Sequence, residues 1–402
     1  MLISSLRFVS FRNMRDAEVA THAKNIFLVG ENGQGKTNFL EGVYFSSYAS
    51  SFRSVSDREL ICNTVHNVDT AEYGEANERK SRSCSVQAHF VAQSTPSLYE
   101  EVLVKIENNR KMVIIDGKRI EDRKELISVA PCIVFCHEDM VFAAGTPEDR
   151  RWFFDQSQSL YDPVYLDDLR HYRKILKSRN SVLKDYENDM LYKTQILNVL
   201  DPQLARYGIH IMKKRAEAVR LFSQTFTPLY THVAGIDNIE VRYIPSWKRP
   251  AMPLYTEATE NDIVPDEQPD EDTIIALLKK RREGDCSFGT TMTGPHRDKY
   301  AFTHRGTEFA RTASTGQRRL LVLLLRVAEA QRFSDISGRK PILLLDDVLL
   351  ELDPEKRRRF LEVLPEYDQA FYTFLREEPY MRHQKFDTIL YKVDNGALSR
   401  MN

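Results

Sequence analysis

The pattern of apolar and polar positions over the first 130 residues is that of β-strands. Apolar residues alternate with polar ones, or form short runs, and several polar segments separate them. Asp116-Gly117 follows the last run, and this pair is typical of a tight hairpin turn. We therefore expect strands at 2–8, 26–29, 86–91, 102–106 and 112–115, and an antiparallel sheet attached to a core that carries a phosphate-binding loop.

The pattern changes to that of helices near residue 146. Thr146-Pro147-Glu148-Asp149 combines a capping residue, a first-turn proline and acids, and predicts a helix start. Apolar residues then recur every three or four positions. They predict one helix over about 166–190 and a second one that starts at Asp201-Pro202, paired as an antiparallel hairpin. Core packing is the simplest explanation of their apolar stripes.

The rest of the middle region is mixed. Alternation predicts a strand at 239–244, and residues 272–282 predict a helix that stops at Gly284. Residues 256–272 carry eight acidic side chains and no basic one. We interpret this stretch as a solvated loop rather than a binding site.

A phosphate-binding motif lies between a predicted strand and a predicted helix. Residues 30–37 read Gly-Glu-Asn-Gly-Gln-Gly-Lys-Thr and fit G-x-x-x-x-G-K-[ST]. Glycines let backbone N–H groups surround phosphate oxygens, Lys36 can reach the β- and γ-phosphates, and the Thr37 hydroxyl can ligate Mg²⁺. The predicted nucleotide contacts are Gly30, Glu31, Asn32, Gly33, Gln34, Gly35, Lys36, Thr37 and Asn38.

A second apolar strand, at 341–345, ends in two carboxylates, Asp346 and Asp347. Asp346 has the place of the Walker B acid, which holds Mg²⁺ together with Thr37, and Asp347 stands where a base or water-positioning group is needed. Adjacent residues of a strand point to opposite sides, so the two acids should have different roles. Acids that end a strand can also simply cap a helix. The predicted catalytic residues are Lys36, Asp346 and Asp347.

Two further motifs complete the pattern. Ser314-Thr315-Gly316-Gln317 opens a strongly helical run, and residues 350–353 form a short connection into a helix at Pro354. The combination resembles ABC-type ATPases, in which the signature segment caps a nucleotide held by the other subunit. Ser314, Gly316 and Gln317 are thus predicted nucleotide contacts. One P-loop and one signature per chain imply an ATP-dependent head-to-tail homodimer.

The long separation of Lys36 and Asp346 predicts an insertion in the ATPase domain. The expected fold is α/β: an ABC-type P-loop ATPase head, with a mixed sheet and an antiparallel β lobe, and an inserted, mainly helical arm. The predicted parts are the N-terminal head lobe at 1–135, the arm at 136–289, and the C-terminal head with signature, Walker B and D-loop at 290–402. This arm is far shorter than an SMC stalk.

The charge balance of the chain narrows the choice of partners. The chain has 57 basic and 58 acidic residues, a net charge of −1, so nucleic acid would have to bind a local basic surface. The candidates are Arg53, Lys279, Lys280, Arg281 and Arg282, and a second basic run covers 356–359. Either run can also be an ordinary solvated helix face.

Five scattered cysteines predict no zinc site and suit a reducing compartment. Cys132 and Cys136 are interpreted as small core residues. The chain shows no signal-peptide layout and no apolar run long enough to span a bilayer. We therefore expect a cytoplasmic protein without a membrane partner.

Over nearly its whole length the chain resembles the RecF family, the bacterial recombination-mediator ATPases. The resemblance lies in residues 11–13, 30–38, 51–53 and 138–155, in Gly294-Pro295-His296-Arg297-Asp298, and in 343–353. It implies ATP and Mg²⁺ as cofactors and slow hydrolysis. It also implies ATP-dependent dimers on gapped DNA or at junctions of single- and double-stranded DNA, acting with RecR and RecO to place RecA in DNA repair, replication restart and the SOS response.

Two positions depart from the common pattern, and two other functions remain open. Thr315 stands where the family usually has glutamine. Thr373 stands where transporter ATPases have a switch histidine, and the sequence does not assign it a role. The alternatives are a transporter-type ATP-binding subunit, which would lack the helical insertion and residues 294–298, and an SMC-like DNA bridge, which would need a longer arm.

Overall fold

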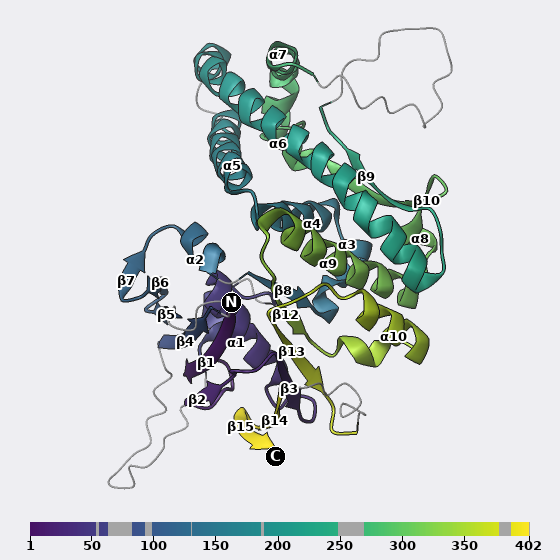
Figure 1. The fold of residues 1–402 in the computed structure, drawn as a ribbon. Coiled ribbons are helices and arrows are strands. Elements are labelled where there is room, and N and C mark those ends of the chain that lie inside the picture. Colours follow the sequence, from purple (N-terminus) through teal and green to yellow (C-terminus); the bar gives the residue numbers. More distant parts are fainter. Residues whose placement is uncertain are drawn as a thin grey trace. The chain divides into compact units, whose positions relative to one another are not determined.

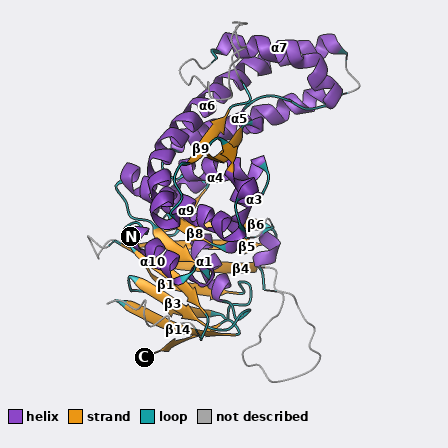
Figure 2. Cartoon of the chain, turned by 90° about the vertical axis from the view of Figure 1, so that its right-hand side faces the viewer, coloured by secondary structure: helices purple, strands orange, loops and turns teal. Residues whose placement is uncertain are grey.

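The computed structural model describes residues 1–53, 56–62, 83–92, 99–129, 131–185, 189–247, 269–377 and 387–401. Two compact units make up the chain. Unit 1 comprises Met1–Asp139 and Leu323–Asn402, and unit 2 comprises Met140–Val322. Strands dominate unit 1 and helices dominate unit 2 (Figures 1 and 2).

The central sheet of unit 1 has the strand order β15-β14-β3-β13-β12-β8. All neighbouring pairs are parallel except β14 and β15. Such a sheet places the carboxyl ends of its strands along one edge, where α/β proteins bind ligands. The strands are β3 (Asn25–Val29), β8 (Cys132–Phe135), β12 (Ile342–Leu345), β13 (Gln369–Phe374), β14 (Thr388–Asp394) and β15 (Ala397–Met401).

The second sheet of unit 1 is antiparallel, which confirms the predicted β lobe. Its strand order is β2-β1-β4-β5-β6-β7. Asp116 and Gly117, both with positive φ, turn the chain from β6 into β7 as the sequence predicts. The strands are β1 (Leu2–Val9), β2 (Ala17–Ala20), β4 (Ser83–Val91), β5 (Tyr99–Glu107), β6 (Arg110–Ile115) and β7 (Lys118–Ile120).

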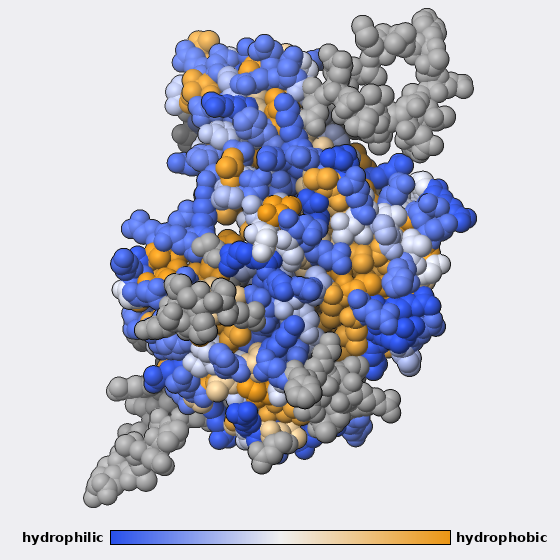
Figure 3. Space-filling view, in the orientation of Figure 1, coloured by the Kyte–Doolittle hydropathy of each residue, from blue (hydrophilic) through white to orange (hydrophobic). Residues whose placement is uncertain are grey.

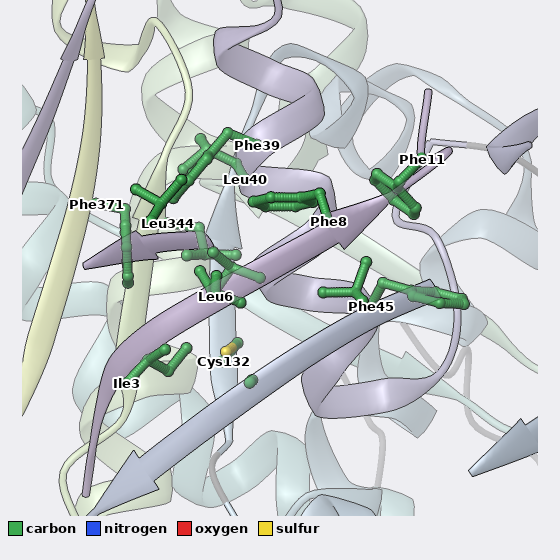
Figure 4. Packing of buried hydrophobic residues seen from close by; sticks show 14 of the residues in the cluster. Ile3, Leu6, Phe8, Phe11, Phe39, Leu40, Phe45, Cys132, Leu344 and Phe371 are labelled. Carbon is green, nitrogen blue, oxygen red and sulfur yellow. The ribbon is translucent and has the colours of Figure 1, made fainter. Parts of the chain in front are cut away.

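The core of unit 1 joins both sheets to α1 (Lys36–Tyr48). Figure 4 shows Phe8 of β1, Phe39 of α1 and Phe371 of β13 in this core. The Phe8 and Phe39 ring centroids are 5.3 Å apart, and those of Phe39 and Phe371 are 6.0 Å apart. Because α1 is held on both sides, the P-loop at its N-terminus has a rigid base. The remaining helices include η1 (Asp57–Leu60), α2 (Arg123–Val129), η2 (His137–Asp139), η4 (Val348–Glu351) and α10 (Pro354–Val363).

Unit 2 contains the helical arm and a three-stranded antiparallel sheet of order β11-β10-β9. Ion pairs Asp162–Lys214 and Arg179–Asp201 show that α5 and α6 run antiparallel, as predicted. The elements are α3 (Met140–Ala144), α4 (Pro147–Ser159), α5 (Pro163–Leu183), α6 (Met190–Ala234), β9 (Ile239–Ile244), α7 (Glu271–Phe288), η3 (Pro295–Arg297), β10 (Lys299–His304), β11 (Thr307–Glu308) and α8 (Phe309–Thr312). The last helix, α9 (Thr315–Ser337), begins in this unit and ends in unit 1.

Three helix boundaries of the arm differ from the prediction. The first helix was expected to continue to about residue 190, but α5 ends at Leu183. Asp201-Pro202 does not start a helix, because α6 runs 45 residues through it and is capped by Asp189 instead. The buried Asp201 pairs with arginines rather than with its own helix end. Likewise α7 passes through Gly284 and ends at Phe288, and Gly289, with a φ of 62°, forms the left-handed cap.

The compact units divide the chain differently from the predicted domains. The first unit boundary, at 139/140, lies close to the predicted one at 135/136, but unit 2 continues through Val322 instead of ending at 289. The segment 290–322, with the signature, therefore belongs to the compact unit of the arm. Of the acidic stretch, residues 256–268 lie outside the described residues, while Asp270 caps α7. No helix in the described ranges is long and apolar enough for a membrane span.

Candidate nucleotide-binding site

The P-loop follows β3 and leads into α1 in unit 1, as the motif predicts. Gly33 and Gly35 have φ of 79° and 114°, a backbone conformation that residues with a Cβ rarely adopt. A Cβ on Gly35 would lie 2.9 Å from Asn13 Oδ1, and one on Gly30 would lie 2.5 Å from the carbonyl oxygen of Val393. Three of the motif's glycines are thus required by the backbone and its neighbours.

A hollow of about 270 Å³ opens over this loop. Its size and its backbone N–H groups suit a polyphosphate. The lining residues are Glu31, Asn32, Gly33, Gly35, Lys36, Thr37, Asn38, Arg53 and Asp347. Most of the predicted P-loop contacts therefore do face one site.

Gly30 and Gln34, the other two predicted contacts, brace the loop. The Gly30 carbonyl oxygen accepts a hydrogen bond from Lys36 Nζ at 2.7 Å. The Gln34 carbonyl accepts from Gly396 N–H at 2.8 Å, and Gln34 Oε1 accepts from Asn395 N–H at 2.7 Å. Asn395 and Gly396 form the β14–β15 turn, so this turn supports the P-loop, a role that the sequence did not reveal.

Lys36 is only 4% exposed, and its ammonium also donates to the carbonyl of Glu31 at 3.2 Å. These two carbonyl bonds hold the positive charge over the loop. A buried ammonium at this place would attract the charged end of a polyphosphate strongly, because little water screens it.

Thr37 and Asp346 meet at the edge of the hollow. The Thr37 hydroxyl donates to Asp346 Oδ1 over 3.0 Å. Burial and the negative charge of Asp347 raise the pKa of Asp346 to about 6, although hydrogen bonds from Thr37 and Thr373 oppose this shift. A buried carboxylate beside a hydroxyl is a hard-oxygen donor pair that fits Mg²⁺, and Thr37 and Asp346 would hold it. Bound Mg²⁺ would neutralise the nucleotide's phosphate charge.

Asp347 corrects one expectation about the paired acids. β12 ends at Leu345, and Asp347 adopts a left-handed conformation with φ of 51°, so the two acids do not alternate along a strand. Both carboxylates instead approach the hydroxyl of Thr373. They still differ in environment, because Asp347 lines the hollow while Asp346 is buried beneath it.

A buried carboxylate behind the hollow was missed by motif analysis. Glu41 is fully buried and accepts hydrogen bonds from Arg12 at 2.8 and 2.9 Å and from Arg53 at 2.7 Å. Although burial alone would raise the pKa of Glu41, the bonds from Arg12, Ser51 and Arg53 hold it below its usual value. Arg53, predicted as a DNA contact, is thereby aimed at the nucleotide hollow.

Asn13 and Asn38 extend this arrangement. Asn38 Nδ2 donates to Asn13 Oδ1 at 2.7 Å, and Arg53 donates to Asn38 Oδ1. The resemblance drew attention to the segments that hold Arg12, Asn13 and Arg53, but Arg12 and Asn13 had no predicted role and Arg53 was predicted only as a DNA contact. Only the folded structure shows that they converge on the P-loop.

The signature residues form the N-terminus of α9, on the part of that helix that lies in unit 2. Gln317 N–H donates to Ser314 Oγ at 3.2 Å, and Ser314 N–H donates to Gln317 Oε1 at 2.8 Å. This reciprocal cap orients the exposed Ser314, Thr315 and Gly316. A Cβ on Gly316 would meet no atom within 4 Å, so the segment has an open surface.

The two basic runs behave differently. On α7, Lys279, Lys280 and Arg281 are exposed, but Arg282 is buried and donates to Asp201 Oδ2 at 2.7 Å. Arg282 therefore belongs to the arm's interior, and its prediction as a DNA contact is wrong. On α10, the basic side chains contact their own helix or its cap: the ion pairs are Lys356–Asp353, Arg358–Glu362 and Arg359–Glu355, and Arg357 donates to the Leu352 carbonyl.

Comparison with known proteins identifies the family of this chain. Residues 2–397 match the family described as RecF/RecN/SMC N terminal domain. The DNA replication and repair protein RecF of Treponema pallidum (strain Nichols) is 38% identical over 389 residues, which cover 97% of this chain and 98% of that protein. RecF of Shouchella clausii (strain KSM-K16) is 30% identical over 404 residues, with 100% of both chains covered.

Solved structures show the same fold. A structure of the recombination mediator protein RecF-ATP in the RecFOR pathway has a TM-score of 0.81 at 23% identity and covers 100% of this chain and 97% of its own. The Smc head domain of Pyrococcus furiosus has a TM-score of 0.51 at 14% identity and covers 99% and 95%. The fold is therefore an ABC-type ATPase head with an inserted arm, and the chain belongs to the RecF branch of the RecF/RecN/SMC family.

Proposed function

We propose that this chain is an ATP-dependent DNA-binding protein of recombinational repair and replication restart, and a slow, DNA-stimulated ATPase. The observation that carries the ATPase is the hydrogen bond between Thr37 and Asp346 at the hollow that Lys36 lines. It brings the P-loop and the Walker B acid, far apart in sequence, to one place. Relatives named for DNA replication and repair support the process.

In this proposal ATP holds two chains together on DNA. The signature around Ser314 is capped, exposed and shaped as a helix N-terminus, which suits a phosphate. If it contacts the nucleotide of a second chain, ATP stabilises the dimer because the ligand binds only the assembled site well. Hydrolysis then removes the bridge, so the switch needs a stable bound state more than rapid turnover.

The wider function follows from the RecF relatives. The dimer would bind gapped DNA or junctions of single- and double-stranded DNA. It would act in the cytoplasm with RecR and RecO to help load RecA, and it would contribute to the SOS response. The exposed Lys279, Lys280 and Arg281 are the proposed phosphate contacts on the arm. The long α5–α6 hairpin favours this function over that of a transporter subunit.

Sedimentation of the full chain with and without ATP, and with gapped DNA, tests the proposal. We expect a monomer without ATP and a DNA-bound dimer with it. Lys36→Met should weaken ATP binding at least tenfold, because it removes the charge that faces the phosphates. Ser314→Arg should keep ATP binding but prevent dimer formation.

Ser178→Arg is the matched control, since Ser178 is an exposed serine on α5 away from the signature segment. It should dimerise like the parent protein. A parent protein that stays monomeric with both ATP and DNA would contradict the proposal. Normal dimerisation of the Ser314→Arg variant would contradict a nucleotide site shared between two chains, but it would not contradict the P-loop assignment.

A further inference from the structure

Thr373 occupies the centre of the paired acids. It lies in β13, next to β12 in the central sheet, and is 4% exposed. Its Oγ1 lies 3.1 Å from Asp346 Oδ1 and 2.9 Å from Asp347 Oδ1. It also accepts a hydrogen bond from the backbone N–H of Asp347 at 2.7 Å. One hydroxyl thus contacts both carboxylates and the backbone that carries the second.

The backbone of Asp347 needs such support. Its φ of 51° and ψ of 20° are left-handed, a conformation that costs about 1 kcal/mol for a residue other than glycine. It adopts this conformation between the end of β12 and the start of η4. The turn moves the Asp347 carboxylate out of line with Asp346 and into the wall of the hollow. The bond from Asp347 N–H to Thr373 holds the turn in that conformation.

The hydroxyl has a fixed capacity for hydrogen bonds. It carries one hydrogen, so it accepts from Asp347 N–H and donates to one carboxylate at a time. Asp346 has a second donor, the Thr37 hydroxyl at 3.0 Å. Asp347 has no such alternative among the hydrogen bonds of the described residues. Asp347 therefore depends on Thr373 twice, through its N–H and through its carboxylate.

We propose that Thr373 is a positioning residue of the ATPase site, whose hydroxyl fixes the left-handed turn at Asp347 and so aims that carboxylate into the nucleotide hollow. The proposal rests on the proposed ATPase function. It gives a role to the position where transporter ATPases have a switch histidine: this threonine acts beneath the acids and does not itself line the hollow.

The test compares Thr373→Val, which removes the hydroxyl at similar shape, with Thr373→Ser, which keeps it. Thr373→Val should lower kcat at least tenfold while the affinity for ATP stays within threefold, because Lys36 and the P-loop are untouched. Thr373→Ser should restore kcat to within threefold of the parent. Asp347→Asn should lose kcat as well, and the double variant should lose little more than Asp347→Asn alone, since both changes remove one arrangement.

The outcomes distinguish failure of the positioning role of Thr373 from failure of the proposed ATPase function. Near-parental kcat in Thr373→Val, with Asp347→Asn inactive, would overturn the positioning role and leave the ATPase intact. Loss of kcat in Thr373→Ser equal to that in Thr373→Val would also overturn it, because the hydroxyl would not matter. If Thr373→Val does not fold, Thr373→Ala is compared with Thr373→Ser by the same criteria. A parent protein that neither binds nor hydrolyses ATP would refute the proposed function itself.

Discussion

Two clusters of buried charge in this chain differ in whether a hollow reaches them. The open cluster, in unit 1, consists of Glu41, Arg12 and Arg53; the carboxylate is 0% exposed, and the arginines are 19% and 25% exposed. The closed cluster, in unit 2, consists of Arg179, Asp201 and Asp285, all at 0–1%. Both satisfy buried carboxylates with guanidinium groups at hydrogen-bond distance.

The difference separates two uses of the same chemistry. In the open cluster, Glu41 holds Arg53 against the hollow, so the pair can act on a ligand. In the closed cluster, Arg179 ties α5 to α6 through Asp201 and to α7 through Asp285. Removing one member of a sealed group leaves uncompensated buried charge. We therefore expect the closed cluster to govern stability and the open cluster to govern nucleotide binding.

Breaking the closed cluster should have the largest effect. Arg179→Ala leaves Asp201 and Asp285 buried with fewer partners, and the free energy of unfolding should fall by about 3–5 kcal/mol. Urea unfolding of the full chain measures this loss. The affinity of the folded protein for ATP should stay within twofold, because all residues that line the hollow belong to unit 1.

Lys177→Ala on the same helix is the control, since Lys177 is exposed, and it should change stability by less than about 0.5 kcal/mol. Equal stability of the Arg179→Ala and Lys177→Ala variants would contradict the structural role of the closed cluster.

The second effect concerns pH and lies next to the closed cluster. His296 Nε2 contacts the carbonyl of Thr291, whose hydroxyl accepts from Arg179, and His296 Nδ1 contacts the Tyr172 hydroxyl at 2.8 Å. Burial lowers the pKa of His296 to about 4, against the raising effect of the Thr291 carbonyl. Three positive charges add to the lowering: Arg297, Arg151 and Arg179.

The folded chain therefore keeps His296 neutral, whereas the unfolded chain binds a proton below about pH 6.5. The free energy of unfolding is therefore highest above pH 6.5 and falls as the pH falls from 6.5 toward 4. Between pH 7 and pH 5 the loss should amount to about 2 kcal/mol. Urea unfolding at several pH values measures it. His296→Gln should flatten this part of the profile, and His171→Gln, at an exposed histidine, should not.

The sequence predicted those parts of the fold that depend on local patterns. Strand alternation located β1 and β9, and the capping residue Thr146 with the proline and acids that follow it located α4, because these signals need only neighbouring residues. Asp201-Pro202 carries an equally good local signal for a helix start. It failed because Asp201 is neutralised by Arg179, 22 positions away in the chain, which no local pattern contains.

The same limit applies to the candidate site. The P-loop and Walker B residues are contiguous motifs and could be assigned, whereas Glu41 and Asn13 act only through residues that folding brings near. Arg282 was predictable in principle. Its spacing from Leu278 and Asp285 places all three on one helix face, which is the buried one. The prediction of a DNA contact used only the four consecutive basic residues 279–282 and did not consider which helix face each residue occupies.

Changing the open cluster should affect binding more than stability. Arg53→Ala should weaken ATP binding about tenfold, or about 1.4 kcal/mol, because a guanidinium that lines the hollow is lost. Arg53→Ala should lower the free energy of unfolding by less than Arg179→Ala does, since Arg12 still pairs with Glu41. Titration with a fluorescent ATP analogue measures the affinity. Arg58→Ala, at an exposed arginine that bonds Asn109, is the control, and equal affinities for both variants would contradict a nucleotide role for Arg53.

The smallest effect is expected for basic side chains at the surface. Binding to DNA can compare those that form ion pairs within their own helix with those that do not. Lys279, Lys280 and Arg281 are exposed and have no ion-pair partner among the described residues, so they can release counterions from DNA. Changing all three to alanine should weaken binding to gapped DNA about fivefold and make the salt dependence shallower by roughly 2. Arg358→Ala with Arg359→Ala should do neither, because these arginines already pair with Glu362 and Glu355. Equal losses in both variants would mean that pairing within a helix does not decide which basic side chains of this chain bind DNA.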